Sequence, residues 1–147
     1  MKKIQKKNII LPVLALVIYL LAQQGNGSSF ALLGDSASDS SLQSAFATQQ
    51  SNVQIKGQGI VRKVLLGDGT GLQHQKIILQ VGREQTVLVA HNIDVAGRLP
   101  GLKQGDTVEF YGEYEWTAQG GVMHWTHRDP SGRHINGWLK YNGKTYQ

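Results

Sequence analysis

The 147-residue sequence predicts a mainly β domain: a small antiparallel barrel with a short N-terminal helix and a C-terminal hairpin. Three observations predict this fold class. From Val53 onward apolar residues recur at every second position, which is the periodicity of strands. Glycine-bearing turns divide that part into about five short strands. The phrase Leu102-Lys-Gln-Gly-Asp-Thr-Val108 then enters a strand after a non-strand passage, as in the fourth strand of many OB-fold domains. We therefore expect an OB-like barrel, with a generic β-sandwich as the alternative.

The first 31 residues predict export. Four lysines precede an apolar run at 9–22, and Ser29-Phe-Ala31 fits a small-x-small cleavage site. Because this run is shorter than the ~20 residues that span a bilayer, we expect 1–31 to be a cleaved signal peptide, with an uncleaved N-terminal membrane anchor as the alternative. In both cases the domain lies outside the cytoplasm, either periplasmic, secreted or anchored, and touches the membrane only through this segment.

The net charge of +5 belongs mostly to this segment, which holds Lys2, Lys3, Lys6 and Lys7. From residue 32 onward eleven Lys and Arg face ten Asp and Glu. The domain therefore carries no strong nucleic-acid charge signature. Since there is no cysteine, a lipoprotein anchor, disulfides and thiolate chemistry are excluded.

The segment between the leader and the barrel is rich in Gly and Ser, so we predict a linker at 32–40 and the folded domain at 41–147. Asp39 or Ser40 is expected to cap a short helix that runs to about Gln49. Leu42 and Ala45 lie on one face of that helix and would pack on the barrel.

The predicted strands follow one another with short turns. The first begins at Val53 and bends at Gly57 and Gly59. The other predicted strands are residues 75–81 and 85–91, which form a hairpin, residues 108–116, residues 122–126, and a final hairpin across Asn142-Gly143. Parity places the following side chains inward: Ile77, Leu79, Val81, Val87, Val89, Val108, Phe110, Gly112, Tyr114 and Trp116.

The stretch 122–134, VMHWTHRDPSGRH, carries the most chemistry in the sequence. On a strand, His124 and His127 would point to opposite faces, which argues against a helical metal motif. Asp129-Pro-Ser-Gly132 has the residue preferences of a type I turn. If the chain reverses there as a hairpin, His127 faces His134 and Arg128 faces Arg133.

Such a pair has two chemical interpretations. Opposed imidazoles could share a divalent metal, with His124 as a third ligand if the strand ends early. They could equally act as base and anion binder, with Asp129 as a further acid–base group or ligand and Arg128 and Arg133 holding an anionic substrate. A half-exposed histidine bonded to a backbone carbonyl is the structural alternative.

A second group of candidates lies outside this stretch. His74 and His91 are expected at the same end of the hairpin formed by the second and third strands. His91 and Asp94 would form a carboxylate–imidazole pair, although an Asx-type turn cap explains the same residues more simply. Trp125 is expected in the core or as a lid on the barrel, and the alternative is a binding surface, shared with Tyr111, on which a base or sugar ring stacks. Glu113 and Glu115 are more typical of a solvated strand face than of a paired-carboxylate site.

From about Leu42 to Gln147 the sequence resembles DUF3465, a family of small exported bacterial proteins of unknown function that is marked by an HWTH motif. The resemblance rests on several segments. They are Gly57-Gln-Gly-Ile-Val61, His74-Gln-Lys76, Ala90-His-Asn-Ile-Asp94, Gly112-Glu-Tyr-Glu-Trp116, Gly121-Val-Met-His-Trp-Thr-His127, Asp129-Pro-Ser-Gly132, His134 and Gly137-Trp138. The resemblance implies export and the location of the site, but it assigns no chemistry.

Two functions follow as expectations. The first is metal binding with metal-assisted hydrolysis of a phosphodiester at His127, His134 and Asp129, for which a divalent metal is the implied cofactor. In this first function His74, His91 and Asp94 could join the site. The second is a non-catalytic module that binds an oligonucleotide, a glycan or an envelope protein through Trp125, Tyr111 and the arginines Arg128 and Arg133. The ligand is unknown in both cases, and an anionic or oligomeric one is expected.

Overall fold

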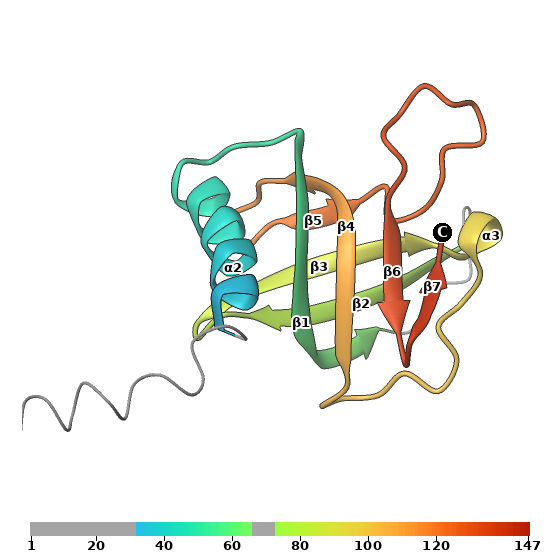
Figure 1. Ribbon diagram of the computed structural model, residues 1–147, viewed down its shortest axis with the longest axis horizontal. Coiled ribbons are helices and arrows are strands. Elements are labelled where there is room, and N and C mark those ends of the chain that lie inside the picture. The colour runs from blue at the N-terminus through green and yellow to red at the C-terminus, as the bar shows by residue number, and fades with distance from the viewer. Residues whose placement is uncertain (1–31, 66–72) are drawn as a thin grey trace, which may run out of the picture. The chain divides into compact units, whose positions relative to one another are not determined.

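β-strands dominate the computed structural model, which describes residues 32–65 and 73–147 (Figure 1). The chain from Asp35 to Gln147 forms one compact unit. The predicted signal peptide or anchor at 1–31 lies outside the described residues. Among the helices that are described, none is long and apolar enough to cross a membrane.

Five strands close into a barrel. They are β1 (Val53–Leu65), β2 (His74–Val81), β3 (Gln85–Asn92), β4 (Thr107–Glu115) and β5 (Val122–His124). Their order is β1-β2-β3-β5-β4, and β1 pairs again with β4 to close the ring. Only the pairing of β3 with β5 is parallel among the described strands. The predicted OB-like barrel is confirmed.

The closure depends on β1, which pairs with two partners in succession. Residues 53–60 pair with β4, and residues 60–65 pair with β2, with an irregular register between Val61 and Lys63. At Gly57 a Cβ atom would lie 2.7 Å from Cζ of Phe110. The strand can therefore curve tightly over the core only because a glycine stands there.

The barrel interior is apolar, and the inward parity predicted from the sequence is confirmed for β2, β3 and β4. Buried and less buried residues alternate along all three strands. The core of the described chain contains Leu42, Ala45, Ile55, Val61, Ile77, Leu79, Val81, Val87, Val89, Leu99, Val108, Phe110, Tyr114, Met123, Leu139, Tyr141 and Tyr146. Trp116 follows β4 and is only partly buried, packed against this core.

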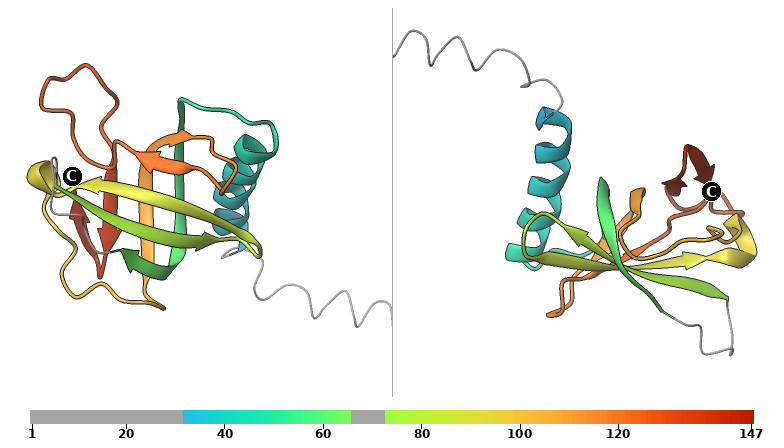
Figure 2. Two further views of the ribbon diagram at one scale, coloured as in Figure 1. Left: turned by 180° about the vertical axis from the view of Figure 1, so that it is seen from behind. Right: turned by 90° about the horizontal axis from the view of Figure 1, so that it is seen from below.

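Two described helices accompany the barrel (Figures 1 and 2). α2 (Leu32–Ala47) begins earlier than the predicted cap at Asp39 or Ser40. Leu42 and Ala45 are buried as predicted, and the chain leaves the helix through Gln49 at φ 53°. α3 (Ile93–Ala96) is a single turn between β3 and β4.

The C-terminal hairpin consists of β6 (Trp138–Tyr141) and β7 (Lys144–Tyr146). Asn142 and Gly143 both have positive φ, 50° and 75°, as the predicted Asn-Gly turn requires. β6 pairs with the same edge of β4 as β5 does: Glu113 faces His124, and Tyr111 faces Trp138.

β5 and β6 are thus two parts of one interrupted strand. The residues between them, 125–137, form a loop that projects from the barrel, and we call this segment the insertion loop (Figure 1).

Candidate functional site

The insertion loop begins where β5 ends, at His124, two residues earlier than the predicted strand end at Thr126. Trp125 has φ 52°, a left-handed conformation that breaks the extended strand. The strand parity that would separate His124 from His127 therefore does not apply. Both residues line the same cleft, as the alternative of an early strand end allowed.

The two ends of the loop meet in a tight neck. The backbone N–H of Gly137 donates to the carbonyl of His127 at 2.9 Å. Any Cβ atom at Gly137 would collide with the carbonyl oxygens of Trp125 and Tyr111, so the close approach requires glycine. The backbone partner of His127 is Gly137, and the predicted hairpin pairing of His127 with His134 is wrong.

The predicted pairing of Arg128 with Arg133 is wrong for the same reason, because the described residues form no strand ladder there. Both side chains are exposed. Arg133 donates from Nε to Oγ of Ser131 at 3.1 Å, within the loop itself.

The turn predicted at Asp129 to Gly132 is confirmed by a 3.0 Å bond from the Gly132 N–H to the Asp129 carbonyl. The Asp129 carboxylate accepts bonds from the backbone N–H groups of Ser131 (2.9 Å), Arg133 (2.8 Å) and His134 (2.8 Å), and from the Ser131 hydroxyl. The bonds from Ser131, followed by those from Arg133 and His134, hold the pKa of Asp129 far below its usual range. Asp129 is therefore an anion whose oxygens organise the loop.

His134 is held at both ring nitrogens. Nδ1 donates to the Ile135 carbonyl and Nε2 to the Glu113 carboxylate, both at 2.8 Å, while the ring stacks on Trp125 with centroids 4.1 Å apart. Partial burial lowers the pKa of His134, but the bonds to Ile135 and Glu113, with the charges of Glu113 and Asp129, outweigh it and raise the pKa above its ordinary value. Two acceptors and a stacked indole favour the imidazolium form.

His127 is oriented by one bond and is only 8% exposed. Its Nδ1 lies 2.7 Å from the Arg128 carbonyl. Since a carbonyl can only accept, Nδ1 carries the proton, and in the neutral ring Nε2 keeps the lone pair. The His127 ring lies 5.5 Å from Trp125, so this indole contacts both His127 and His134.

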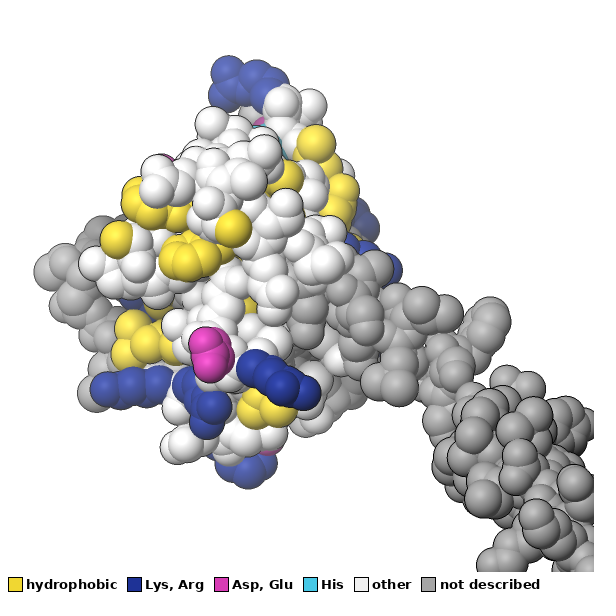
Figure 3. Space-filling view, turned by 90° about the vertical axis from the view of Figure 1, so that its left-hand side faces the viewer, with side chains coloured by type: hydrophobic (Ala, Val, Ile, Leu, Met, Phe, Trp, Pro, Cys, Tyr) yellow, Lys and Arg dark blue, Asp and Glu magenta, His cyan; other side chains and the backbone are white. Residues whose placement is uncertain are grey.

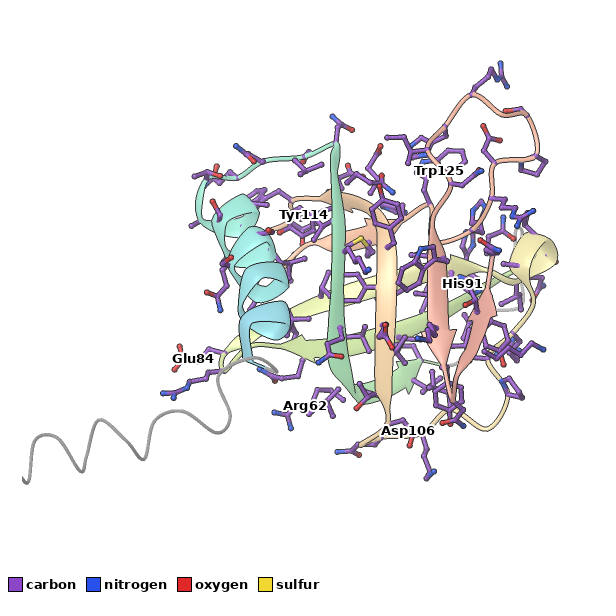
Figure 4. The ribbon with its side chains drawn as sticks, in the orientation of Figure 1. Arg62, Glu84, His91, Asp106, Tyr114 and Trp125 are labelled. Atoms are coloured by element: carbon purple, nitrogen blue, oxygen red, sulfur yellow. The ribbon has the colours of Figure 1, made fainter. Side chains whose placement is uncertain are left out.

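His91 anchors the neck from inside the barrel (Figure 4). Nε2 must donate to the Gly97 carbonyl at 3.1 Å, so Nδ1 accepts from the hydroxyl of Thr126 at 2.9 Å. Both His91 and Thr126 are fully buried, and burial lowers the pKa of His91 to about 4. His91 is thus a neutral ring that fixes Thr126, the third residue of the HWTH motif.

A surface cleft of about 490 Å³ lies beside the loop. The residues that line it are His74, Ala90, Asn92, Val95, Glu113, Glu115, His124, Trp125, His127, Asp129 and Pro130. Glu115 and His124 form a pair across it at 3.4 Å. The cleft therefore combines three imidazoles, three carboxylates and one indole.

Several predicted site residues lie elsewhere. Arg128, Arg133 and Tyr111 do not line the cleft, and His134 bonds to Glu113 without lining it. Asp94 accepts from the backbone of Gln73, while Asn92 caps α3, so the turn-cap interpretation of residues 91–94 describes their contacts. In the described parts of the chain no three His, Asp or Glu side chains are arranged to hold a metal ion.

Sequence reasoning missed the importance of Glu113 and Glu115, which it assigned to a solvated strand face. The missing information was the register. Glu113 faces His124 across β4 and β5, and Glu115 faces Val122. The sequence did offer a signal for them: Glu113 and Glu115 are on the outer face of one predicted strand, and the next predicted strand carries histidines.

The fold and the cleft define an OB-like barrel domain whose fifth strand is interrupted by a histidine-bearing loop. A family model described as "Protein of unknown function (DUF3465)" matches residues 25–147. The chain belongs to this DUF3465 family, as its sequence segments predicted. No curated protein matches it.

Proposed function

We propose that this chain is a non-catalytic binding domain that acts outside the cytoplasm and holds a carbohydrate in the cleft beside Trp125. The observation that carries the proposal is the lining of the cleft: an indole among imidazoles, carboxylates and one amide, with no lysine or arginine among the lining residues. Its volume of about 490 Å³ lies within the ~300–1,000 Å³ of small-ligand sites.

The lining chemistry suits hydroxyl groups, which both donate and accept hydrogen bonds. Glu113 and Glu115 offer acceptor oxygens, and His127, whose Nδ1 faces the Arg128 carbonyl, offers Nε2 as its second polar atom. Trp125 adds an apolar surface, although His134 stacks on its ring. A sugar, which has polar edges and an apolar ring face, fits this combination.

An oligonucleotide fits the cleft less well. Its phosphates would meet the carboxylates, while Arg128 and Arg133 lie outside the lining. On the side of the molecule that Figure 3 shows, several Lys and Arg side chains lie along the lower edge, with hydrophobic side chains and an acidic one between them.

The extracellular setting is supported by the leader sequence alone. Residues 1–31 have the lysine-rich start, the apolar run and the small-x-small site of an export signal. A fractionation of cells that express the tagged chain would place it in the periplasm or the medium; recovery from the cytosol would contradict this part of the proposal.

Binding is tested with an array of immobilised oligosaccharides, followed by calorimetry on the sugar that binds best. His127→Ala and Glu115→Gln should each weaken binding about five- to tenfold, because each removes about one hydrogen bond. Arg128→Ala, exposed and outside the cleft, should bind as the wild type does. Failure of the wild type to bind any sugar, or equal affinity in all three variants, would overturn the proposal.

A second candidate function is metal-assisted hydrolysis of a phosphodiester at the same cleft. The observation in its favour is that His74, His124 and His127 all line the cleft beside Glu113 and Glu115, a donor set that suits divalent metals once side chains reorient. His134 already donates from both nitrogens, so it does not join this set without releasing a bond. In this function Asp129 remains the anion that shapes the loop.

The two functions separate by metal analysis. Stoichiometric Zn²⁺ or Mn²⁺ in the purified wild type, lost in His127→Ala and retained in His134→Ala, would favour hydrolysis. Metal content near zero after incubation with either ion would exclude it and leave the carbohydrate proposal unaffected.

A further inference from the structure

We propose that the ligand is an extended glycan that continues from the cleft onto a second subsite, the aromatic face, formed by Lys56 of β1, Tyr111 of β4 and Trp138 of β6. This inference rests on the proposed function, because the cleft would hold the first sugar of the same chain. Neither Lys56 nor Trp138 was among the site residues predicted from the sequence.

The three residues form one row across the sheet. Lys56 is the register partner of Tyr111, and Tyr111 is the register partner of Trp138. The two rings lie 6.2 Å apart at 40°, and the Lys56 ammonium lies 5.7 Å from the Trp138 ring centre. Lys56 is exposed and both rings are partly exposed, so the row belongs to the outer surface.

The barrel core does not account for these aromatic residues. Along β4 the buried positions are Val108, Phe110, Gly112 and Tyr114, and Tyr111 lies on the opposite, outer face. Trp138 likewise precedes the buried Leu139 on β6. Partly exposed aromatic rings side by side on a sheet form a surface on which the apolar face of a sugar ring can stack.

The aromatic face adjoins the cleft. Tyr111 and Glu113 lie on the same face of β4, two residues apart, which corresponds to about 7 Å along a strand. Glu113 lines the cleft and also bonds to His134, the ring stacked beneath Trp125. A chain of linked sugars that leaves the cleft past Glu113 therefore reaches Tyr111 and Trp138 next.

The polar residues around the row favour a glycan over a polyanion. On one flank Lys140 and Glu109 form an ion pair at 3.4 Å, so both signs of charge are present. On the other flank Gln54, the register partner of Glu113, has a buried amide nitrogen that lacks a hydrogen bond to any described residue. Such a donor is uncommon in folded proteins, and a ligand hydroxyl reached by rotation of this side chain would satisfy it.

The experiment compares short and long ligands by calorimetry. The probes are the disaccharide and the hexasaccharide of β-1,4-linked glucose and of β-1,4-linked N-acetylglucosamine. With the wild type the hexasaccharide of the recognised sugar should bind about tenfold more tightly than its disaccharide, because stacking of further sugar rings on Tyr111 and Trp138 adds about 1.4 kcal/mol. Trp138→Ala and Tyr111→Ala should abolish this gain and bind the disaccharide as the wild type does.

Two further variants make the comparison decisive. Lys56→Ala changes an exposed side chain and should fold normally, so it tests the row if an aromatic variant fails to fold; it should reduce the gain. Ile60→Ala removes an exposed apolar side chain from the same strand and should retain the full gain. A wild type that binds both lengths equally, or a gain that survives in Trp138→Ala, would overturn the aromatic face while the cleft proposal stands. A wild type that binds neither length of any tested sugar would overturn both.

Discussion

The wall of the barrel and the insertion loop are stabilised in different ways. In β2 and β3 alternate apolar side chains are buried, and the strands hold because those side chains leave water. In the loop few side chains are buried, and the backbone is held by the Asp129 carboxylate and by a bond from the Asp129 N–H to Asn136 Oδ1. Apolar periodicity specifies the wall, while individual hydrogen bonds specify the loop.

Two histidines illustrate the same difference. His91 lies in the wall, where burial lowers its pKa to about 4. His134 lies in the loop, where the bonds to Ile135 and Glu113 outweigh the effect of partial burial and raise its pKa. Neutral His91 fixes the neck from inside, and protonated His134 supports Trp125 from outside.

The neck that joins the two regions gives the largest expected effect. Gly137→Ala should destabilise the protein by about 3 kcal/mol, because the new methyl group collides with backbone carbonyls of Trp125 and Tyr111 that cannot move without opening β4. Gly132→Ala is the matched control, since its site is open and only its φ of 67° disfavours alanine, at a cost of about 1 kcal/mol. Urea unfolding measures both. An equal decrease in the free energy of unfolding in both variants would show that the backbone at the neck is not closely packed against Gly137.

The sequence predicted the barrel well because alternation, glycine bends and the Asn-Gly turn are local signals. It also located the turn at Asp129. It failed on the pairing of His127, since a left-handed Trp125 and the approach of Gly137 to His127 depend on β5 and β6 sharing one edge of β4. That arrangement is a tertiary contact, and no periodicity in the sequence indicates it.

Acidification should weaken the wall through His91. Its folded pKa of about 4 lies below the unfolded value of 6.5, so the unfolded state binds the proton more tightly and stability falls as pH decreases through this window. Between pH 7 and pH 5 the loss should be roughly 2 kcal/mol from this group. His91→Gln removes the titrating ring, so its unfolding free energy should change less over the same range. An identical pH dependence in both proteins would show that His91 is not the group responsible.

The loop should respond in the opposite direction and more weakly, through His134. Because its folded pKa lies above the unfolded 6.5, the stability it contributes is fully present below that value and is lost as pH rises through the folded pKa.

Glu113→Gln keeps the shape of the partner but removes its charge, so the pKa of His134 should fall while that of His91 stays low. Proton NMR titration of the imidazole C–H signals measures both rings in one sample, and Glu109→Gln, on the same face of β4 but paired with Lys140, is the control. An unchanged His134 midpoint in Glu113→Gln would mean that the Glu113 bond does not stabilise the imidazolium of His134. Glu113, which joins β4 to the insertion loop, would then have no effect on the pKa of either histidine.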